Sequence, residues 1–100
     1  MNPVRVGVIG IGAMGWHHAR VLSLLRDAEL VAVADPDPER GRLAVEQFGC
    51  RWTTDYRQLL GEVEAVCIAV PTLLHHSVGM AALQAGVHVL IEKPIAATQE

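Results

Sequence analysis

Apolar runs alternate with segments of mixed polarity along the whole chain. The apolar runs predict buried strands, and the segments between them carry apolar residues at helical spacing. The predicted strands are residues 4–9, 30–34, 51–53, 65–70 and 87–91, and the predicted helices are residues 14–25, 38–48, 55–60 and 72–85. Continuous apolar strands separated by helices are typical of a parallel sheet that is covered on both faces.

Local signals predict where these helices end. Asp37 is the predicted N-cap of the second helix, Pro38 suits its first turn, and Gly49 suits its end. Thr72 is the predicted cap of the helix over residues 72–85, and Gly86 ends it. In the first helix, the spacing predicts one apolar face made of Met14, His18, Val21, Leu22 and Leu25.

The order of these elements predicts an α/β fold with a Rossmann-type doubly wound parallel sheet. Right-handed crossovers place the strands in the order 3-2-1-4-5, within three αβα layers. Such sheets usually have six strands, and residues 98–100 resemble the start of another helix. We therefore interpret residues 1–100 as one Rossmann-type domain that is truncated near its C-terminal end and forms the N-terminal part of a longer protein. A complete five-strand domain is the alternative.

A glycine-rich loop joins the first predicted strand to the first helix. Gly10, Gly12 and Gly15 have the spacing that permits a tight turn, close approach of a pyrophosphate, and close packing of helix on sheet. The free N–H groups at the helix N-terminus favour a bound phosphate. We expect the cofactor to contact Gly10, Ile11, Gly12, Ala13, Met14 and Gly15.

An acidic residue after the second strand indicates which dinucleotide binds. Asp35 can accept hydrogen bonds from a ribose 2′-OH, whereas a 2′-phosphate would face its carboxylate. Asp37 adds to that negative field, so NAD is favoured over NADP. Arg40 and Arg42 leave an alternative open, because either guanidinium could reach a 2′-phosphate or lie on a solvated helix face.

Composition narrows the function further. The net charge is −3, and the lack of a Lys/Arg cluster argues against nucleic acid or an anionic membrane surface as partner. Cys50 and Cys67 have no metal or redox spacing, and the histidines have no convincing zinc geometry, so we predict no metal site. We expect Cys67 to be a buried free thiol and the protein to be cytoplasmic.

Several motifs together resemble the Gfo/Idh/MocA family, named for glucose-fructose oxidoreductase and inositol dehydrogenase. They are the segments 10–19, 34–35, 71–75 and 86–94, the last of which contains Glu92-Lys93-Pro94. The resemblance implies an NAD(P)-dependent dehydrogenase acting on sugar, nucleotide-sugar or cyclitol carbons, and a homo-oligomer for the full-length protein. The runs 14–18 and 68–72 are similar to those of members that act on UDP-N-acetyl sugars, such as UDP-N-acetylglucosamine 3-dehydrogenases.

The resemblance also assigns roles to individual residues. Pro71, Thr72 and His75 match the loop beside the nicotinamide half of the cofactor, as Glu92 and Lys93 match a pair near the nicotinamide. Lys93 is the implied catalytic residue, because a cation there polarises the substrate oxygen. The family's principal acid/base lies in a second domain, which leaves half an active site in these residues.

Two other functions remain open at this point. A non-catalytic NAD(H)-sensing module would bind the cofactor without turnover. A methyltransferase-type domain would bind S-adenosylmethionine, although such domains usually lack this phosphate-loop spacing.

Overall fold

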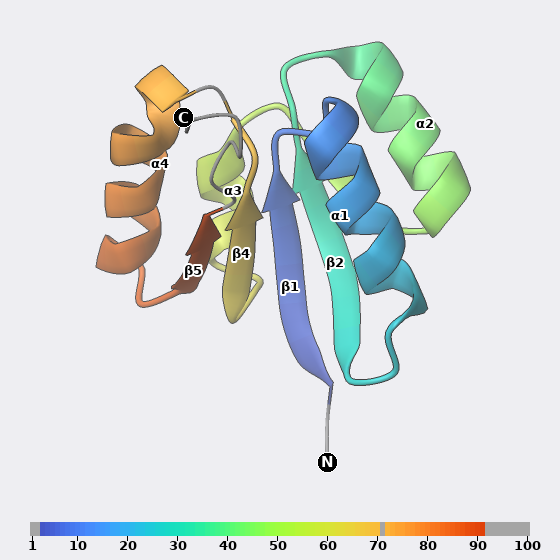
Figure 1. Cartoon of the computed structure of the whole chain (residues 1–100), viewed down its shortest axis with the longest axis horizontal. Coiled ribbons are helices and arrows are strands. Elements are labelled where there is room, and N and C mark those ends of the chain that lie inside the picture. Colours follow the sequence, from blue (N-terminus) through green and yellow to red (C-terminus); the bar gives the residue numbers. More distant parts are fainter. Residues whose placement is uncertain (1–2, 71, 92–100) are drawn as a thin grey trace, which may run out of the picture.

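The structure is a computed structural model that describes residues 3–70 and 72–91. Its elements alternate as predicted. In chain order they are β1 (Val4–Ile9), α1 (Ala13–Leu24), β2 (Ala28–Ala34), α2 (Pro38–Phe48), β3 (Arg51–Thr53), α3 (Tyr56–Leu60), β4 (Ala65–Ile68), α4 (Thr72–Gln84) and β5 (His88–Ile91). The pairings are all parallel, and the order β3-β2-β1-β4-β5 confirms the predicted fold class and topology (Figure 1).

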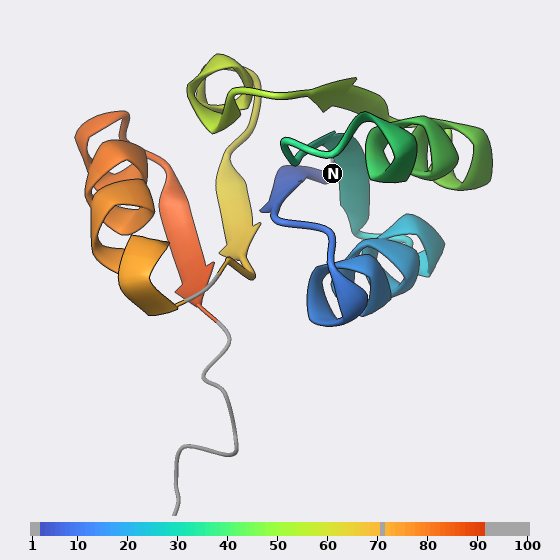
Figure 2. The ribbon, with the colours of Figure 1, turned by 90° about the horizontal axis from the view of Figure 1, so that it is seen from above.

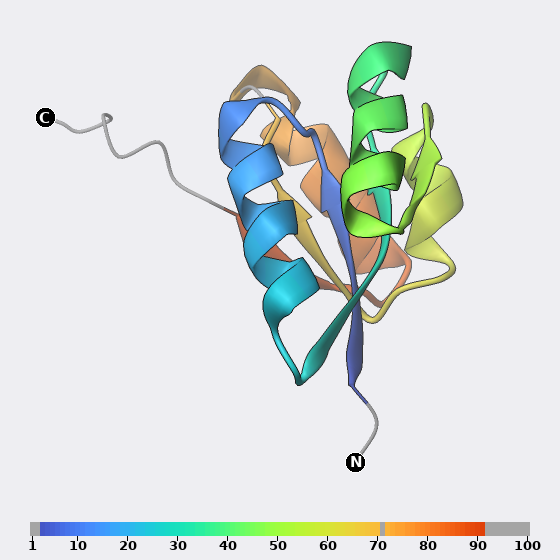
Figure 3. The same cartoon turned by 90° about the vertical axis from the view of Figure 1, so that its right-hand side faces the viewer.

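The helices cover the sheet from both sides. Viewed from above, α1 and α3 lie on opposite sides of the central strands (Figure 2). Helices α1 and α2 stand side by side over one face (Figure 3). The sheet is therefore the middle of three layers, as a doubly wound fold requires.

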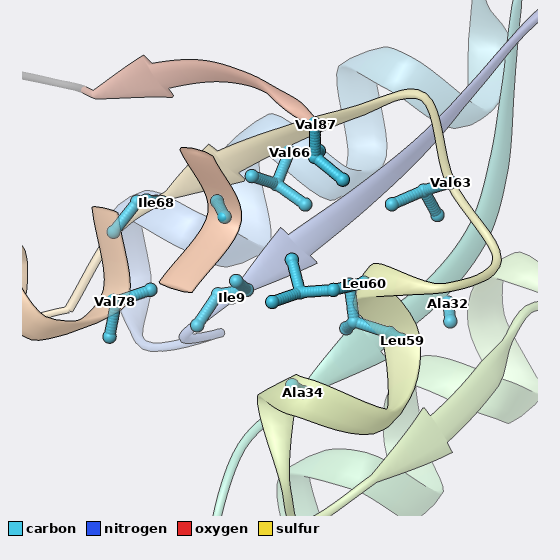
Figure 4. Packing of buried hydrophobic residues seen from close by; sticks show 11 residues of the cluster. Ile9, Ala32, Ala34, Leu59, Leu60, Val63, Val66, Ile68, Val78 and Val87 are labelled. Carbon is cyan, nitrogen blue, oxygen red and sulfur yellow. The ribbon is translucent and has the colours of Figure 1, made fainter. Parts of the chain in front are cut away.

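Alternating side chains of the strands fill two separate cores. Between the sheet and helices α3 and α4, the buried cluster consists of Ile9, Ala32, Ala34, Leu59, Leu60, Val63, Val66, Ile68, Val78, Ala82 and Val87 (Figure 4). A second buried cluster lies between the sheet and helices α1 and α2 and consists of Val8, Ile11, Ala19, Val33, Ala44, Cys50 and Cys67. Cys50 and Cys67 are both buried and are not joined in a disulfide, as expected for the Cys67 thiol.

The predicted helix ends agree with the caps that the structure has. The Asp37 carboxylate accepts a hydrogen bond from the backbone N–H of Glu39 at 3.0 Å, and Pro38 opens α2. Gly49 ends that helix in the left-handed conformation, with φ of 70°. Thr72 is an exception, because α4 begins at Thr72 itself and the expected cap is a helical residue instead.

The predicted inner face of α1 is correct only in part: His18 and Leu22 are half-buried, and Leu22 packs against the buried cluster on this side of the sheet. Gly15 and Ala19 are the buried residues of this helix, whereas Met14, Val21 and Leu25 are exposed. The small residues allow the helix axis to lie close to the sheet, and larger side chains are displaced to its flanks. Apolar spacing alone does not reveal this, because it gives no weight to glycine and alanine as contact residues.

Strand boundaries also differ slightly from the prediction. β2 begins at Ala28, two residues before the predicted start, and β4 ends at Ile68, two residues before the predicted end. The pairing of β1 with β2 shifts register between Val6 and Gly7. A side chain at Gly7 would contact Leu59 of α3 at 2.8 Å, so glycine allows α3 to approach the centre of the sheet.

Candidate cofactor site

The carboxyl ends of the parallel strands meet at one edge of the sheet, where the loop between β1 and α1 turns. Gly10 makes that turn with φ of +90°, and its N–H donates to the Ala34 carbonyl at 2.7 Å. A Cβ at this position would lie 2.8 Å from the carbonyl oxygen of Ala69. Only glycine combines this conformation with this close approach.

Gly15 allows α1 to pack against the same turn. A Cβ built on Gly15 would overlap the carbonyl oxygen of Gly10 and lie 3.3 Å from the Ala69 side chain. The third glycine of the motif is therefore required by the fold itself, as predicted for helix packing on the sheet.

Gly12 differs from both, because the fold has no visible need for glycine there. Its φ is −66°, which any residue adopts, and a built Cβ would find the Arg40 Nη1 atom as its nearest neighbour at 3.9 Å. Gly12 is the N-cap of α1, and no side chain caps this end of the helix. The first N–H groups of a helix have no intrahelical partner, and their dipoles favour an anion.

Asp35 holds the glycine loop in place. It is 6% exposed, and its Oδ2 accepts a hydrogen bond from the Ile11 N–H at 2.9 Å. Its Oδ1 accepts from the Asp37 N–H at 2.8 Å. The predicted ribose ligand is thus also a structural link between two loops, and a ribose hydroxyl would have to use the remaining lone pairs of the same carboxylate.

Trp52 holds the backbone of Asp35 in place, a contact that the sequence pattern did not predict. The indole N–H of Trp52 donates to the backbone carbonyl of Asp35 at 2.9 Å. Gly41 in α2 lies against that indole, and a Cβ on Gly41 would overlap the ring. A glycine inside an otherwise regular helix was the available signal for such a close contact.

An open hollow of about 290 Å³ lies between α1 and α2, next to the glycine loop. Its lining comprises Ile11, Gly12, Ala13, Trp16, Arg40 and Leu43. Trp16 packs against Phe48 with 4.8 Å between ring centroids, so it has a packing role. Arg40 brings a positive charge to the hollow, and its Nε lies 3.8 Å from Asp37 Oδ2.

The remaining predicted site residues are placed only in part. Thr72 begins α4 and His75 lies in its first turn. Pro71, Glu92 and Lys93 lie outside the described residues.

Within residues 3–70 and 72–91, no group of three or more His, Cys, Asp or Glu side chains has a geometry that could hold a metal ion. No helix in this part of the chain is long and apolar enough to cross a membrane.

A parallel sheet in this order, a glycine turn at its switch point, an uncapped helix N-terminus and an acidic residue ending β2 define a dinucleotide-binding Rossmann domain. The sequence model of the GFO_IDH_MocA family, described as an oxidoreductase family with an NAD-binding Rossmann fold, matches residues 4–100. The chain belongs to this family, which confirms the resemblance to the Gfo/Idh/MocA family. The family description also confirms NAD as the expected cofactor.

Known proteins of the family match nearly the whole chain. A UDP-N-acetylglucosamine 3-dehydrogenase from Acidithiobacillus ferrooxidans is 42% identical over 94 residues, which cover 94% of this chain and 29% of that protein. A scyllo-inositol dehydrogenase from Lactobacillus casei, solved with NAD(H) and scyllo-inositol, superposes with a TM-score of 0.88 at 28% identity, over 94% of this chain and 29% of that one.

A third relative was solved with the phosphorylated cofactor. The 3-ketoreductase from Actinomadura kijaniata, in complex with NADP and TDP-benzene, has a TM-score of 0.85 and 37% identity, covering 94% of this chain and 30% of that one. The chain spans less than a third of the length of these relatives.

Proposed function

We propose that this chain is the cofactor half of an enzyme that transfers hydride between a nicotinamide cofactor and a CH–OH group of a sugar, nucleotide sugar or cyclitol. The observation that supports it best is the space around Gly12. The fold leaves room for a side chain at this N-cap and yet glycine stands there, next to a helix end without a capping side chain. Close approach of a pyrophosphate explains both features.

The residues around this loop would divide the cofactor between them. The N-terminus of α1, with Gly12, Ala13 and Met14, would hold the pyrophosphate, and Asp35 would accept a hydrogen bond from the adenosine ribose. Gly10 and Gly15 would keep the loop and helix in position. The bound nicotinamide would supply the hydride acceptor or donor.

The substrate end of the site rests on the family resemblance. Lys93, paired with Glu92, would polarise the substrate oxygen as charge develops on it, and Pro71, Thr72 and His75 would border the nicotinamide. In the whole protein, a second domain would contribute the principal acid/base and the rest of the substrate pocket. The similarity to the UDP-N-acetylglucosamine 3-dehydrogenase makes a UDP-N-acetyl sugar the first substrate to test.

Titration with NAD and NADH tests the cofactor site through one substitution and a matched control. We expect Gly12→Ala to weaken NAD binding by about tenfold or more, since a methyl group would displace hydrogen-bonded phosphate. Its free energy of unfolding should change by no more than about 1 kcal/mol. Gly61→Ala is the control, because Gly61 has φ of −80° and nothing within 4 Å of a built Cβ.

Equal NAD affinity for wild type and Gly12→Ala would contradict the proposed site. NAD binding without oxidation of any UDP-N-acetyl sugar, sugar or cyclitol by the whole protein would instead support a sensing module. Binding of S-adenosylmethionine in place of NAD would overturn both.

We further propose a cytoplasmic location and a homo-oligomeric whole protein. The two buried cysteines form no disulfide with each other, which supports a reducing compartment. The net charge of −3 argues against nucleic acid and anionic membranes as partners. Oligomer formation is implied by the family resemblance, and light scattering of the whole protein would measure it.

A further inference from the structure

Asp35 begins a turn that has few backbone donors of its own. The turn between β2 and α2 reads Asp35-Pro36-Asp37-Pro38, and neither proline has a backbone N–H. The residue before a proline is also restricted to an extended backbone. The orientation of the Asp35 carbonyl therefore depends on a donor from another element of the fold.

Strand β3 holds both backbone groups of Asp35. The Asp35 N–H donates to the Thr53 carbonyl at 3.1 Å, which continues the parallel pairing of Ala34 with Thr53. The Asp35 carbonyl accepts a hydrogen bond from the indole N–H of Trp52 at 2.9 Å. The first bond is available to any residue at position 53, whereas the second requires a side-chain donor at position 52.

Packing of the indole fixes the direction of its N–H. Trp52 packs against the buried cluster between the sheet and helices α1 and α2. Gly41 of α2 lies directly against the ring, where a Cβ would overlap the indole atoms. The N–H of Gly41 donates to the Asp37 carbonyl at 3.1 Å, so the same glycine belongs to the first turn of α2. The indole is thus held between β3 and the start of α2.

The Asp35 carboxylate tolerates little displacement. It is 6% exposed, and its oxygens accept the N–H groups of Ile11 at 2.9 Å and Asp37 at 2.8 Å. A ribose hydroxyl has to use the remaining lone pairs of the same two oxygens. Hydrogen bonds weaken steeply as their angle departs from linearity. A rotation of the Asp35 backbone would therefore disturb all three interactions together.

We propose that Trp52 is a positioning residue for the dinucleotide: by holding the Asp35 carbonyl, it orients the Asp35 carboxylate and so sets the affinity for the cofactor. This inference rests on the proposed cofactor site. Trp52 does not line the hollow beside the glycine loop, so it acts through Asp35 rather than by contact with the cofactor. The nicotinamide is at the other end of the dinucleotide, so the hydride step itself does not depend on Trp52.

Calorimetric titration of the whole protein with NAD and with ADP, which shares the adenosine ribose, tests this inference. Trp52→Phe keeps a ring against Gly41 but has no N–H, and we expect it to weaken binding of both ligands by about fivefold. In steady-state kinetics, the KM for NAD should rise by a similar factor while kcat stays unchanged. Leu30→Ala is the matched control, because Leu30 packs against the same cluster as Trp52. It should lower the melting temperature and leave both affinities unchanged.

A double-mutant cycle tests whether the effect passes through Asp35. In an Asp35→Ala background, Trp52→Phe should change NAD affinity by less than about twofold, because no carboxylate remains to be oriented. Asp35→Asn is the second background if the first variant does not fold, and the effect of Trp52→Phe should again be smaller there than in the wild type.

The possible results separate this inference from the proposed cofactor site. Unchanged NAD affinity in folded Trp52→Phe would overturn the role of Trp52. An equal loss with and without the Asp35 carboxylate would also overturn it, since Trp52 would then support the site by another route. A fall in kcat at constant KM would contradict it as well. Failure of the wild type to bind either NAD or ADP would instead contradict the cofactor site. Thermal unfolding of each variant confirms that the titrated protein is folded.

Discussion

The carboxylate of Asp35 accepts a hydrogen bond from the backbone N–H of Ile11 at 2.9 Å, although the two residues are 24 positions apart in the chain. This bond joins the end of β2 to the glycine loop after β1. The second oxygen accepts from Asp37 at 2.8 Å, at the start of α2. One buried side chain therefore sets the relative position of the two segments that would hold a dinucleotide.

Replacement of Asp35 should affect both folding and cofactor choice. Asp35→Ala leaves two backbone N–H groups without their acceptor, so we expect the free energy of unfolding to fall by about 2–3 kcal/mol in urea titrations. The preference for NAD over NADP should also weaken, because the acceptor for the ribose hydroxyl is lost. Asp35→Asn keeps one acceptor oxygen and should lose less stability. An unchanged affinity ratio in a folded Asp35→Ala protein would contradict the ribose contact.

Replacement by alanine should reduce stability at Gly15 but reduce cofactor binding at Gly12. Gly15→Ala forces a methyl group into the Gly10 carbonyl, and we expect a loss of about 3 kcal/mol or more in unfolding free energy, or failure to fold. Gly12→Ala should preserve stability and weaken NAD binding. Circular dichroism melts of both variants measure the contrast, and a stable Gly15→Ala protein would show that the helix can move away from the turn.

Gly41 and Trp52 should be energetically coupled. Gly41→Ala places a methyl group against the indole and should cost about 1–3 kcal/mol of stability. In a Trp52→Leu background, the same change should cost less, because a smaller side chain leaves room for the methyl group. A double-mutant cycle measures this coupling, and strictly additive losses would contradict it.

Cys50 should make stability depend on pH in the alkaline range. Burial raises the pKa of the Cys50 thiol above its ordinary value of 9.0. The unfolded protein therefore loses this proton at a lower pH than the folded protein. The contribution of Cys50 to stability is complete below the unfolded pKa of 9.0 and is lost as the pH rises from there toward the higher pKa of the folded thiol. Denaturation curves between pH 8 and pH 10 should show a steeper decline for wild type than for Cys50→Ala; parallel curves would contradict the shift.

Lys93→Ala tests the role that the family resemblance assigns. In the whole protein, loss of a cation beside the reacting oxygen should lower turnover by about a hundredfold and leave NAD affinity nearly unchanged. Steady-state kinetics with the best substrate, together with NAD titration, separates the two effects. A loss confined to NAD binding would assign Lys93 to the cofactor instead.

The order of apolar runs, together with the handedness of crossovers, was sufficient to predict the sheet order, and it points to the edge of the sheet where we propose the cofactor site. The predicted ends of α2 were also correct, because Asp37, Pro38 and Gly49 act through local backbone conformation and nearby N–H groups. The phosphate loop was recognisable for the same reason: its glycine spacing reflects a turn and a helix start within a few residues.

Tertiary contacts decided what the linear pattern left open. The buried face of α1 depends on how closely Gly15 and Ala19 let the helix approach the sheet, which apolar spacing does not measure. The two hydrogen bonds of Asp35 join segments that only the folded sheet brings together. The sequence by itself therefore determined the fold and the class of cofactor, while the folded structure decided which charged side chains lie beside the glycine loop, because side-chain partners depend on proximity in space.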